Sequence, residues 1–239
     1  MAGKASIKWL GHGTFIITSS QGKRVITDPW IRENPTCPDK LEDLPSIDLI
    51  TVSHDHFDHA ADVAEISQRF GAMVAAQPET AGRFKSDLGL AEDRVVNSGF
   101  GMNIGGSVTV QGITIVMTQA FHSSETGTAS GYIIKLEDDT TFYHAGDTGI
   151  FSSMKVLGEL YPLDVALLPI GGAFTMDPLQ AAAALQLLAP KAVIPMHFKT
   201  FPFLAQGPDE FIESAKAKAP NVQIIVMSPG EEHDFSSLS

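Results

Sequence analysis

The sequence predicts an α/β fold built as a four-layer αββα sandwich, in which two sheets pack face to face and helices cover their outer surfaces. Two observations support this expectation. Each half of the chain begins with short apolar strands and then alternates strands with helices. The 239 residues are 44% hydrophobic and only 18% charged, which allows a large core and argues against disorder. We expect one domain over residues 1–239.

The first half contains the clearest alternation, with glycines between its early strands and a Pro-containing loop over residues 29–45. Val63, Ile66 and Phe70 recur at helical spacing, and Pro78 stands where the first turn of a helix tolerates proline. The predicted strands are Ser6–Leu10, Thr14–Thr18, Arg24–Asp28, Ile47–Val52 and Ala72–Ala76, and the predicted helices are Ala60–Phe70 and Pro78–Leu88.

The second half is rich in strands before it alternates again. Asp177 followed by Pro178 is typical of a helix start, with an N-cap and a first-turn proline. The predicted strands are Arg94–Asn97, Ser107–Val110, Ile113–Thr118, Gly131–Leu136, Thr140–His144, Val165–Pro169, Val193–Pro195 and Val222–Met227, and the predicted helices are Ser153–Leu160, Pro178–Leu188 and Pro208–Lys218.

Composition limits the partners. The formal charge of −12, without clustered Lys and Arg, disfavours a broad nucleic-acid surface, although bound metal ions could supply positive charge locally. The single cysteine, Cys37, excludes an intrachain disulfide and suits a reducing compartment. The sequence shows neither an eighteen-residue apolar run nor a signal-peptide core. We therefore expect a cytoplasmic protein with a small-molecule substrate and no membrane span; a homo-oligomer remains open.

One segment carries most of the chemistry. Directly after an apolar strand, His54, Asp55, His56, Asp58 and His59 fall within six residues. A sheet presents such a segment at the carboxyl edge of its strands, where α/β folds place their sites. Imidazole nitrogen suits zinc, iron, nickel or copper, and carboxylate oxygen extends the choice to manganese. The alternative, a solvated polar turn, explains less, because so many titratable groups are costly to bury without a cation.

Three later residues occupy the same kind of position. His122, Asp147 and His197 each follow the end of an apolar strand. A lone histidine of this kind is more often structural, but three strand-end residues in a chain that already holds the histidine cluster favour a shared metal site.

At this point the sequence resembles the metallo-β-lactamase-fold superfamily. The pattern is His-x-His-x-Asp-His at residues 54–59, followed by a single His, an Asp and a final His. The segments TQAFHSS, HAGDTG, LLPIGGAFTM and PMHFKTFP resemble a subgroup of predicted metal-dependent hydrolases close to the ascorbate-6-phosphate lactonase type. The resemblance covers essentially the whole chain and implies the αββα fold.

The resemblance also implies a ligand set for two divalent ions, zinc first, with Mn, Ni or Fe as alternatives. One ion would take His54, His56 and His122; the other would take Asp58, His59 and His197; and Asp147 would bridge them. A hydroxide held between the ions would attack an ester, either a phosphodiester or a lactone, in a small substrate. Asp58 or Asp147 would orient the water. True β-lactamases often have Cys at the bridging position, so antibiotic hydrolysis is disfavoured.

Several nearby residues leave two roles open. His12 is either an active-site residue, as the resemblance implies, or a turn histidine. Asp28 either caps a turn or supports a ligand histidine, and we favour support. Asp55 is expected beside the ligands rather than among them. His144 is either a buried structural histidine or a proton donor, and His233 is expected in a solvated acidic tail. Other residues next to the ligands could touch substrate or form an apolar wall: Ser123, Ser124, Thr148, Phe174, Met176, Phe198, Lys199, Thr200, Phe201 and Phe203.

The competing function class is a non-hydrolytic metal-binding scaffold or di-iron redox protein of the same fold. A di-iron protein would normally have a flavin partner domain and a carboxylate in place of one clustered histidine. A scaffold without activity should have lost ligands, yet all seven are present. A binuclear hydrolase is therefore the expected enzyme.

Overall fold

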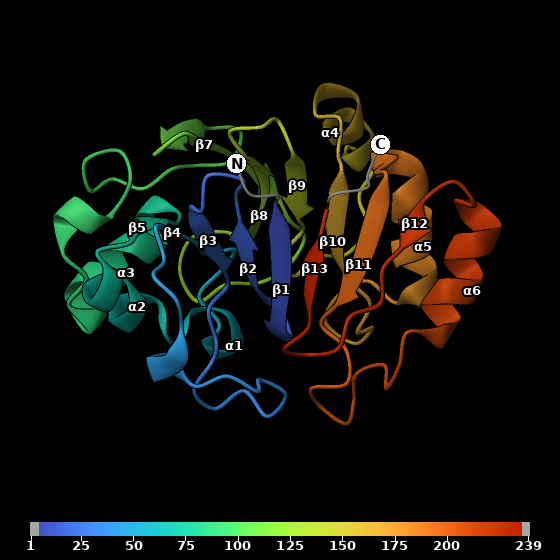
Figure 1. Cartoon of the computed structure of the whole chain (residues 1–239), viewed down its shortest axis with the longest axis horizontal. Helices are drawn as coiled ribbons and strands as arrows, with labels where there is room; N and C mark the ends of the chain where they lie inside the picture. Colours follow the sequence, from blue (N-terminus) through green and yellow to red (C-terminus); the bar gives the residue numbers. More distant parts are fainter. Residues whose placement is uncertain (1–4, 236–239) are drawn as a thin grey trace.

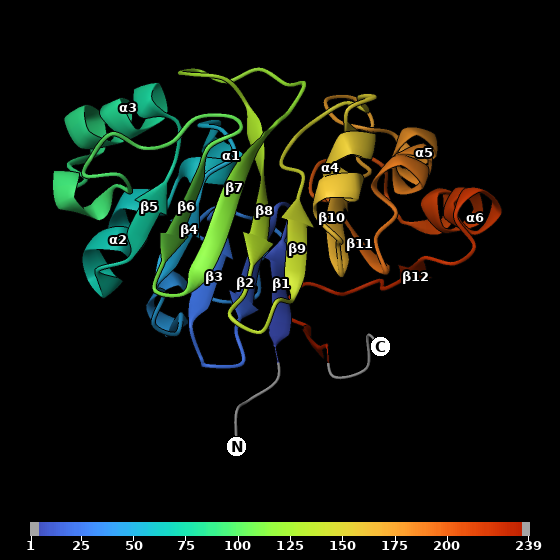
Figure 2. The same cartoon turned by 90° about the horizontal axis from the view of Figure 1, so that it is seen from above.

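The computed structural model describes residues 5–235 and has two mixed sheets with helices on both outer sides (Figure 1). The six-stranded sheet has the order β13-β1-β2-β3-β4-β5, and the seven-stranded sheet has the order β12-β11-β10-β9-β8-β7-β6. Figure 2 shows α2 and α3 on one side of the molecule and α4, α5 and α6 on the other. The predicted α/β sandwich is confirmed.

The six-stranded sheet begins as antiparallel hairpins and ends as parallel strands. β1 pairs antiparallel with β2 and with β13, β2 pairs antiparallel with β3, and β3, β4 and β5 run parallel. Its strands are β1 (Ser6–Gly11), β2 (Thr14–Thr18), β3 (Arg24–Thr27), β4 (Leu49–Thr51), β5 (Met73–Ala75) and β13 (Glu232–Asp234).

The seven-stranded sheet has the same division. β6 to β9 pair antiparallel in sequence order, and β9 to β12 run parallel. Its strands are β6 (Ser107–Val110), β7 (Ile113–Gln119), β8 (Ser130–Lys135), β9 (Thr141–His144), β10 (Val165–Pro169), β11 (Ala192–Met196) and β12 (Gln223–Ile224). Consequently β7, β9, β10 and β11 all point the same way and end at one edge.

The helices start and stop where local chemistry dictates. Asp177 caps α5 by accepting a hydrogen bond from the Gln180 backbone N–H at 2.7 Å. α2 and α3 end at Gly71 and Gly89, both in the left-handed conformation. The helices are α1 (Phe57–Ala60), α2 (Val63–Phe70), α3 (Pro78–Leu88), α4 (Met154–Leu160), α5 (Pro178–Leu188) and α6 (Asp209–Lys218), with 3₁₀ turns at Leu41–Asp43 and Glu92–Arg94.

The core joins the two sheets. Fully buried Phe15 of one sheet and Phe142 of the other belong to a single apolar cluster, and a second cluster lies under α2 and α3. The Tyr132 hydroxyl lies 2.9 Å from the Val52 carbonyl oxygen and 3.0 Å from that of Ala75, so β8 is also linked to the opposite sheet by a buried polar contact. Within residues 5–235, no helix combines the length and apolarity needed to cross a bilayer.

Three predicted elements are wrong or only partly right. Residues 94–97 form no strand, because Arg94 ends a 3₁₀ turn and Asn97 has a positive φ of 54°; only an isolated bridge joins Val95 to Val74. The helix expected over residues 60–70 is split into α1 and α2, since the Asp62 carboxylate accepts hydrogen bonds from the backbone of Ile31 and Arg32. The final strand expected over residues 222–227 shrinks to two residues.

The end of the described chain differs from the expected solvated tail. His233 is half-buried in β13, opposite Ile7 of β1, and its ring centroid lies 5.1 Å from that of Phe235. Nothing in the local sequence indicated a strand here, because the partner strand is more than two hundred residues away. Long-range pairing of this kind overrides local propensity.

Candidate metal centre

The strand-end residues converge at one edge of the sandwich. β4 leads to His54, α1 carries Asp58 and His59, and the segments after β7, β9 and β11 carry the remaining candidates. The ring centroids of His54 and His122 lie 4.9 Å apart, although 68 positions separate them in the sequence. The fold thus gathers all seven residues that the sequence indicated: His54, His56, Asp58, His59, His122, Asp147 and His197.

These side chains form two groups that could each hold an ion. In each group, one ligand-capable atom per residue lies within 4.8 Å of the others. The first group is His54, His56 and His122, and the second is His12, Asp58, His59 and His197; a third combination, Asp28, His54 and His59, takes one histidine from each. The first two groups contain the residues of the two ligand sets that the resemblance implied, with His12 beside the second; metal binding by these residues stays a prediction.

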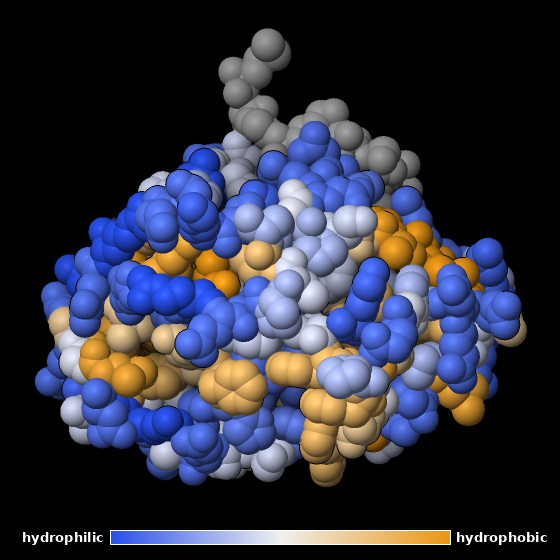
Figure 3. Space-filling view, turned by 90° about the horizontal axis from the view of Figure 1, so that it is seen from below, coloured by the Kyte–Doolittle hydropathy of each residue, from blue (hydrophilic) through white to orange (hydrophobic). Residues whose placement is uncertain are grey.

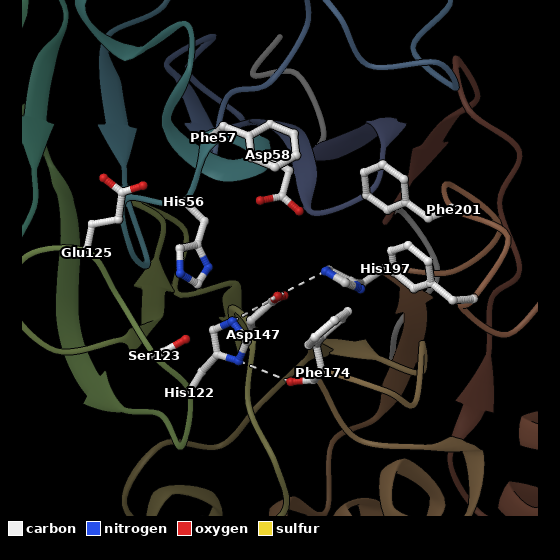
Figure 4. A pocket seen from close by; sticks show the side chains of 11 residues that line it. His56, Phe57, Asp58, His122, Ser123, Glu125, Asp147, Phe174, His197 and Phe201 are labelled. Carbon is white, nitrogen blue, oxygen red and sulfur yellow. Dashed lines mark hydrogen bonds and ion pairs between the residues drawn. The ribbon is translucent and has the colours of Figure 1, made fainter.

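Asp147 lies between the two groups. Its Oδ2 is 3.6 Å from His122 Nε2 and 2.9 Å from His197 Nε2 (Figure 4). Its Oδ1 is 3.4 Å from His59 Nε2. A carboxylate in contact with a histidine of each group has the position that a bridging ligand requires.

Unsatisfied polar atoms test whether a cation fits here. In the described part of the chain, His54 Nε2, His59 Nε2 and Asp147 Oδ1 are buried and have no hydrogen-bond partner. Buried polar atoms are normally paired, so a group of unpaired ones needs an explanation. Nitrogen and carboxylate donors that face one another in this way suit a zinc-type ion, and the residues therefore fit the metal that the pattern implies.

Protonation in the metal-free centre follows burial and charge. Burial, assisted by neighbouring His59, lowers the pKa of His54 to about 3, so this imidazole is neutral and free to bind metal at neutral pH. Burial also disfavours the charged form of His59, but Asp147 and Asp28 outweigh it and raise its pKa well above 6.5. Burial favours neutral Asp147, yet His197 and His59 lower its pKa well below 3.8. Without metal, the charged forms of His59 and Asp147 therefore favour each other.

Asp28 holds the opposite nitrogen of His59. Its Oδ2 accepts hydrogen bonds from His59 Nδ1 at 2.8 Å and from the Ser53 hydroxyl at 2.6 Å, and its Oδ1 accepts one from the Ser53 backbone N–H at 2.7 Å. The contact expected between Asp28 and a ligand histidine is present. It leaves His59 Nε2 pointing into the cluster, which is how carboxylates orient metal-binding histidines.

The backbone is strained at the same place. His12, Asp28 and His197 have positive φ angles of 53°, 43° and 56°, which residues other than glycine seldom adopt. Gly146, next to Asp147, also has a positive φ of 59°, and a Cβ there would lie 2.5 Å from the Ser130 carbonyl oxygen. Such strain gathers at functional sites because the surrounding structure has to impose it.

His12 lies in the turn between β1 and β2 and contacts other members of the second group. Its Nε2 lies 3.1 Å from Asp58 Oδ2, its Nδ1 lies 2.9 Å from the Thr200 hydroxyl, and its ring centroid is 3.8 Å from that of His197. His144, by contrast, is fully buried and donates from Nε2 to the Gly13 carbonyl at 2.9 Å. That contact matches the structural role left open for His144.

Asp55 points away from the ligands, as expected. It accepts hydrogen bonds from Ser124, Thr126 and Arg83, with Arg83 at 2.8 Å. Arg83 also lies 2.7 Å from Glu125. These bonds tie the loop after β7, which carries His122, to the histidine segment after β4.

A cavity of about 420 Å³ opens onto the centre. Figure 4 shows Asp58, His56, His122, Asp147 and His197 around it. The other lining residues are Phe57, Ser123, Glu125, Phe174, Phe201 and Phe203.

The sequence indicated only part of this lining. Phe174, Phe201 and Phe203 were candidates for an apolar wall, whereas Met176 and Phe198 are buried in the core. Phe57 and Glu125 were missed, although both stand within three residues of a ligand histidine, which was the available signal.

The comparisons with known proteins agree with this architecture. The facing sheets and strand-end histidines define the class as the metallo-β-lactamase fold, and residues 6–197 match the family described as the beta-lactamase superfamily domain. UPF0173 metal-dependent hydrolases from Nitratidesulfovibrio vulgaris and Caldivirga maquilingensis are each 46% identical, over 94% of this chain and 93% and 96% of their own lengths. The chain belongs to this hydrolase family of the beta-lactamase superfamily.

A solved structure supports the same assignment. Igni18, a metallo hydrolase from the archaeon Ignicoccus hospitalis, shares 37% of its sequence with this chain and has a TM-score of 0.87. The match covers 98% of this chain and 99% of Igni18, so the likeness includes both sheets and every segment that carries a candidate ligand.

Proposed function

We propose that the protein is a binuclear hydrolase that cleaves an ester bond, a phosphodiester or a lactone, in a small substrate. The observation that carries the proposal is Asp147, which lies between two groups of ligand-capable residues at the wall of an open cavity. The metal-dependent hydrolases of the family support the reaction type. The resemblance to the ascorbate-6-phosphate lactonase type supports the lactone.

Two divalent ions bound here would supply a hydroxide at neutral pH and polarise the ester oxygen. The chain's own residues hold and orient the reactants. Asp58 lines the cavity; burial opposes its charged form, but His12 and His59 lower its pKa, so its carboxylate is ionised and can accept a hydrogen bond from the attacking water and orient it. His12 acts through Asp58 as a positioning residue, since it contacts that carboxylate and is not among the described cavity-lining residues.

The test is a panel assay with purified protein whose metal content has been measured. A chromogenic phosphodiester and several lactones are offered to the protein as isolated, after chelation, and after return of zinc, manganese, nickel or iron. We expect ester hydrolysis that is lost on chelation and restored with two ions per chain. Hydrolysis that survives complete metal removal, or a fully loaded crystal structure with one ion, would contradict the proposal.

A further inference from the structure

We infer that the substrate carries an uncharged apolar group beside its reacting ester, and that a phosphate or carboxylate on that group is disfavoured. The inference rests on the proposed function, because it concerns the same cavity. It selects, within the esters considered above, those whose non-reacting part is a hydrocarbon or aromatic group, so a lactone that carries a phosphate, as ascorbate 6-phosphate does, is not among them.

The first argument is the composition of the wall. Phe57 enters from the start of α1, Phe174 from the segment after β10, and Phe201 and Phe203 from the segment after β11. Figure 3 looks at the lower face of Figure 1, where α1 lies, and shows apolar surface gathered across its middle amid hydrophilic surroundings. Phe57, Phe174 and Phe203 are more than half exposed, which costs solvation free energy unless something apolar covers them.

The second argument is that the wall is preorganised. Buried Trp30 stacks on Phe201 at 5.9 Å between ring centroids and meets Phe57 edge-on at 5.6 Å. Phe201 stacks on Phe203 at 5.4 Å, and Phe203 meets Phe174 edge-on at 5.6 Å. Packed rings lose little conformational entropy when a ligand binds, so the apolar contact is available at low cost.

The third argument is charge. Of the described residues that line the cavity, none is Lys or Arg, and its acidic members are Asp58, Glu125 and Asp147. The nearby cation Arg83 is already paired with both Asp55 and Glu125, and Lys199 lines a different cavity. A phosphate outside the reacting ester would lose water without gaining a cationic partner, whereas phosphate sites normally provide Arg, Lys or backbone N–H donors.

The experiment compares γ-lactones that share one reacting ring. One has a methyl tail, one has a pentyl tail, and one has a pentyl tail ending in a phosphate. We expect the pentyl lactone to exceed the methyl lactone in kcat/KM by at least about tenfold, from burial of the added methylenes. The phosphorylated lactone should fall at least about tenfold below the pentyl lactone. Equal or better hydrolysis of the phosphorylated compound would overturn the inference.

Variants assign the preference to the wall. Phe203→Ala shortens an exposed side chain of the wall, so it should reduce the pentyl-to-methyl ratio of kcat/KM at least about threefold. Phe100→Ala is the matched control, since Phe100 is 76% exposed and lies outside the cavity lining. An unchanged ratio in Phe203→Ala, or an equal loss in Phe100→Ala, would count against the wall.

A binding measurement separates this inference from the proposed function. The metal-loaded protein is titrated by calorimetry with 2-pentylcyclopentanone, an uncleavable ketone, and with its terminally phosphorylated counterpart. Tighter binding of the uncharged ketone, weakened by Phe203→Ala, supports the inference. That support holds even if no lactone or phosphodiester is hydrolysed, because the absence of hydrolysis would reject only the proposed function. Equal or tighter binding of the phosphorylated ketone rejects the inference, whichever ester turns over.

Discussion

His59 is the residue whose surroundings say most about the centre, because both ring nitrogens have defined neighbours. Nδ1 donates to Asp28, and Nε2 lies 3.4 Å from Asp147 Oδ1 without forming a hydrogen bond to it. The first contact fixes the ring, and the second leaves a nitrogen available to an ion. His54 shows the same division: its Nδ1 lies 2.9 Å from the Ser53 hydroxyl, and its Nε2 has no hydrogen-bond partner.

The Asp28 contact can be tested by removing its charge alone. Asp28→Asn keeps the shape but weakens the bond that orients His59, so metal affinity should fall about 10- to 100-fold. Competition with a chromogenic chelator measures this loss. Asp93→Asn, at an exposed surface position, is the control and should match the unmodified protein. Unchanged affinity in Asp28→Asn would show that the ring is held by packing instead.

Asp147→Asn tests the bridge. The carboxylate would neutralise part of a combined charge of about +4 from two divalent ions, and an amide cannot do so. We expect one ion per chain or fewer and at least about a hundredfold slower hydrolysis, the upper end of what loss of a supporting carboxylate causes. Metal stoichiometry and turnover are measured on the same samples. An active variant that retains two ions would place the bridge elsewhere.

At the scale of single elements, strand ends position the centre. Each ligand-bearing segment follows a buried strand, and the parallel or alternating strand order sends β4, β7, β9 and β11 to one edge. This much was predictable from sequence, because apolar runs that end in His or Asp are a local signal. Two elements could not be predicted from such runs. The strand at residues 94–97 was wrong because Asn97 adopts a positive φ, and β13 was missed because it forms by pairing with distant β1.

The turn after β9 offers a test of this positioning. In Gly146→Ala the new Cβ would meet the Ser130 carbonyl oxygen at 2.5 Å, in a backbone conformation already unfavourable for alanine. We expect a loss of about 1–3 kcal/mol in the free energy of unfolding and reduced metal content through displaced Asp147. Urea denaturation and metal analysis report both effects. Gly149→Ala has nothing within 4 Å of its Cβ and should change neither.

At the scale of the whole molecule, the cavity wall is the feature that local sequence reasoning could least supply. Its four phenylalanines come from α1 and from two loops of the other sheet, and Trp30, in a fourth segment, joins Phe57 to Phe201. The candidate metal ligands have a recognisable spacing, whereas the wall residues have no fixed spacing and look like ordinary core residues in the sequence. Only the packing of the two sheets places them on one side of the centre.

The whole molecule also responds to pH through its buried histidines. Burial lowers the pKa of His54 to about 3 and that of His12 to about 4 in the metal-free protein, whereas an unfolded chain has histidine pKa values of about 6.5. Between these values the unfolded state binds more protons than the folded state, so stability is full above about pH 6.5 and falls as pH decreases toward 3. His59 acts oppositely, since its raised pKa stabilises the fold below 6.5.

A pair of variants separates these contributions. In the metal-free protein we expect the free energy of unfolding to fall between pH 7 and 5, with about 2 kcal/mol of the fall assigned to His54 from its shift. His54→Gln should remove that portion of the pH dependence, while His233→Gln in half-buried β13 should retain it. Urea titrations at pH 7, 6 and 5 measure the slopes. A His54→Gln slope equal to that of the parent would mean that folding does not shift the pKa of His54, which would contradict the lowering attributed to its burial.

With ions bound, protons and metal ions compete for the same histidine nitrogens. We therefore expect acid to release the metal below about pH 6.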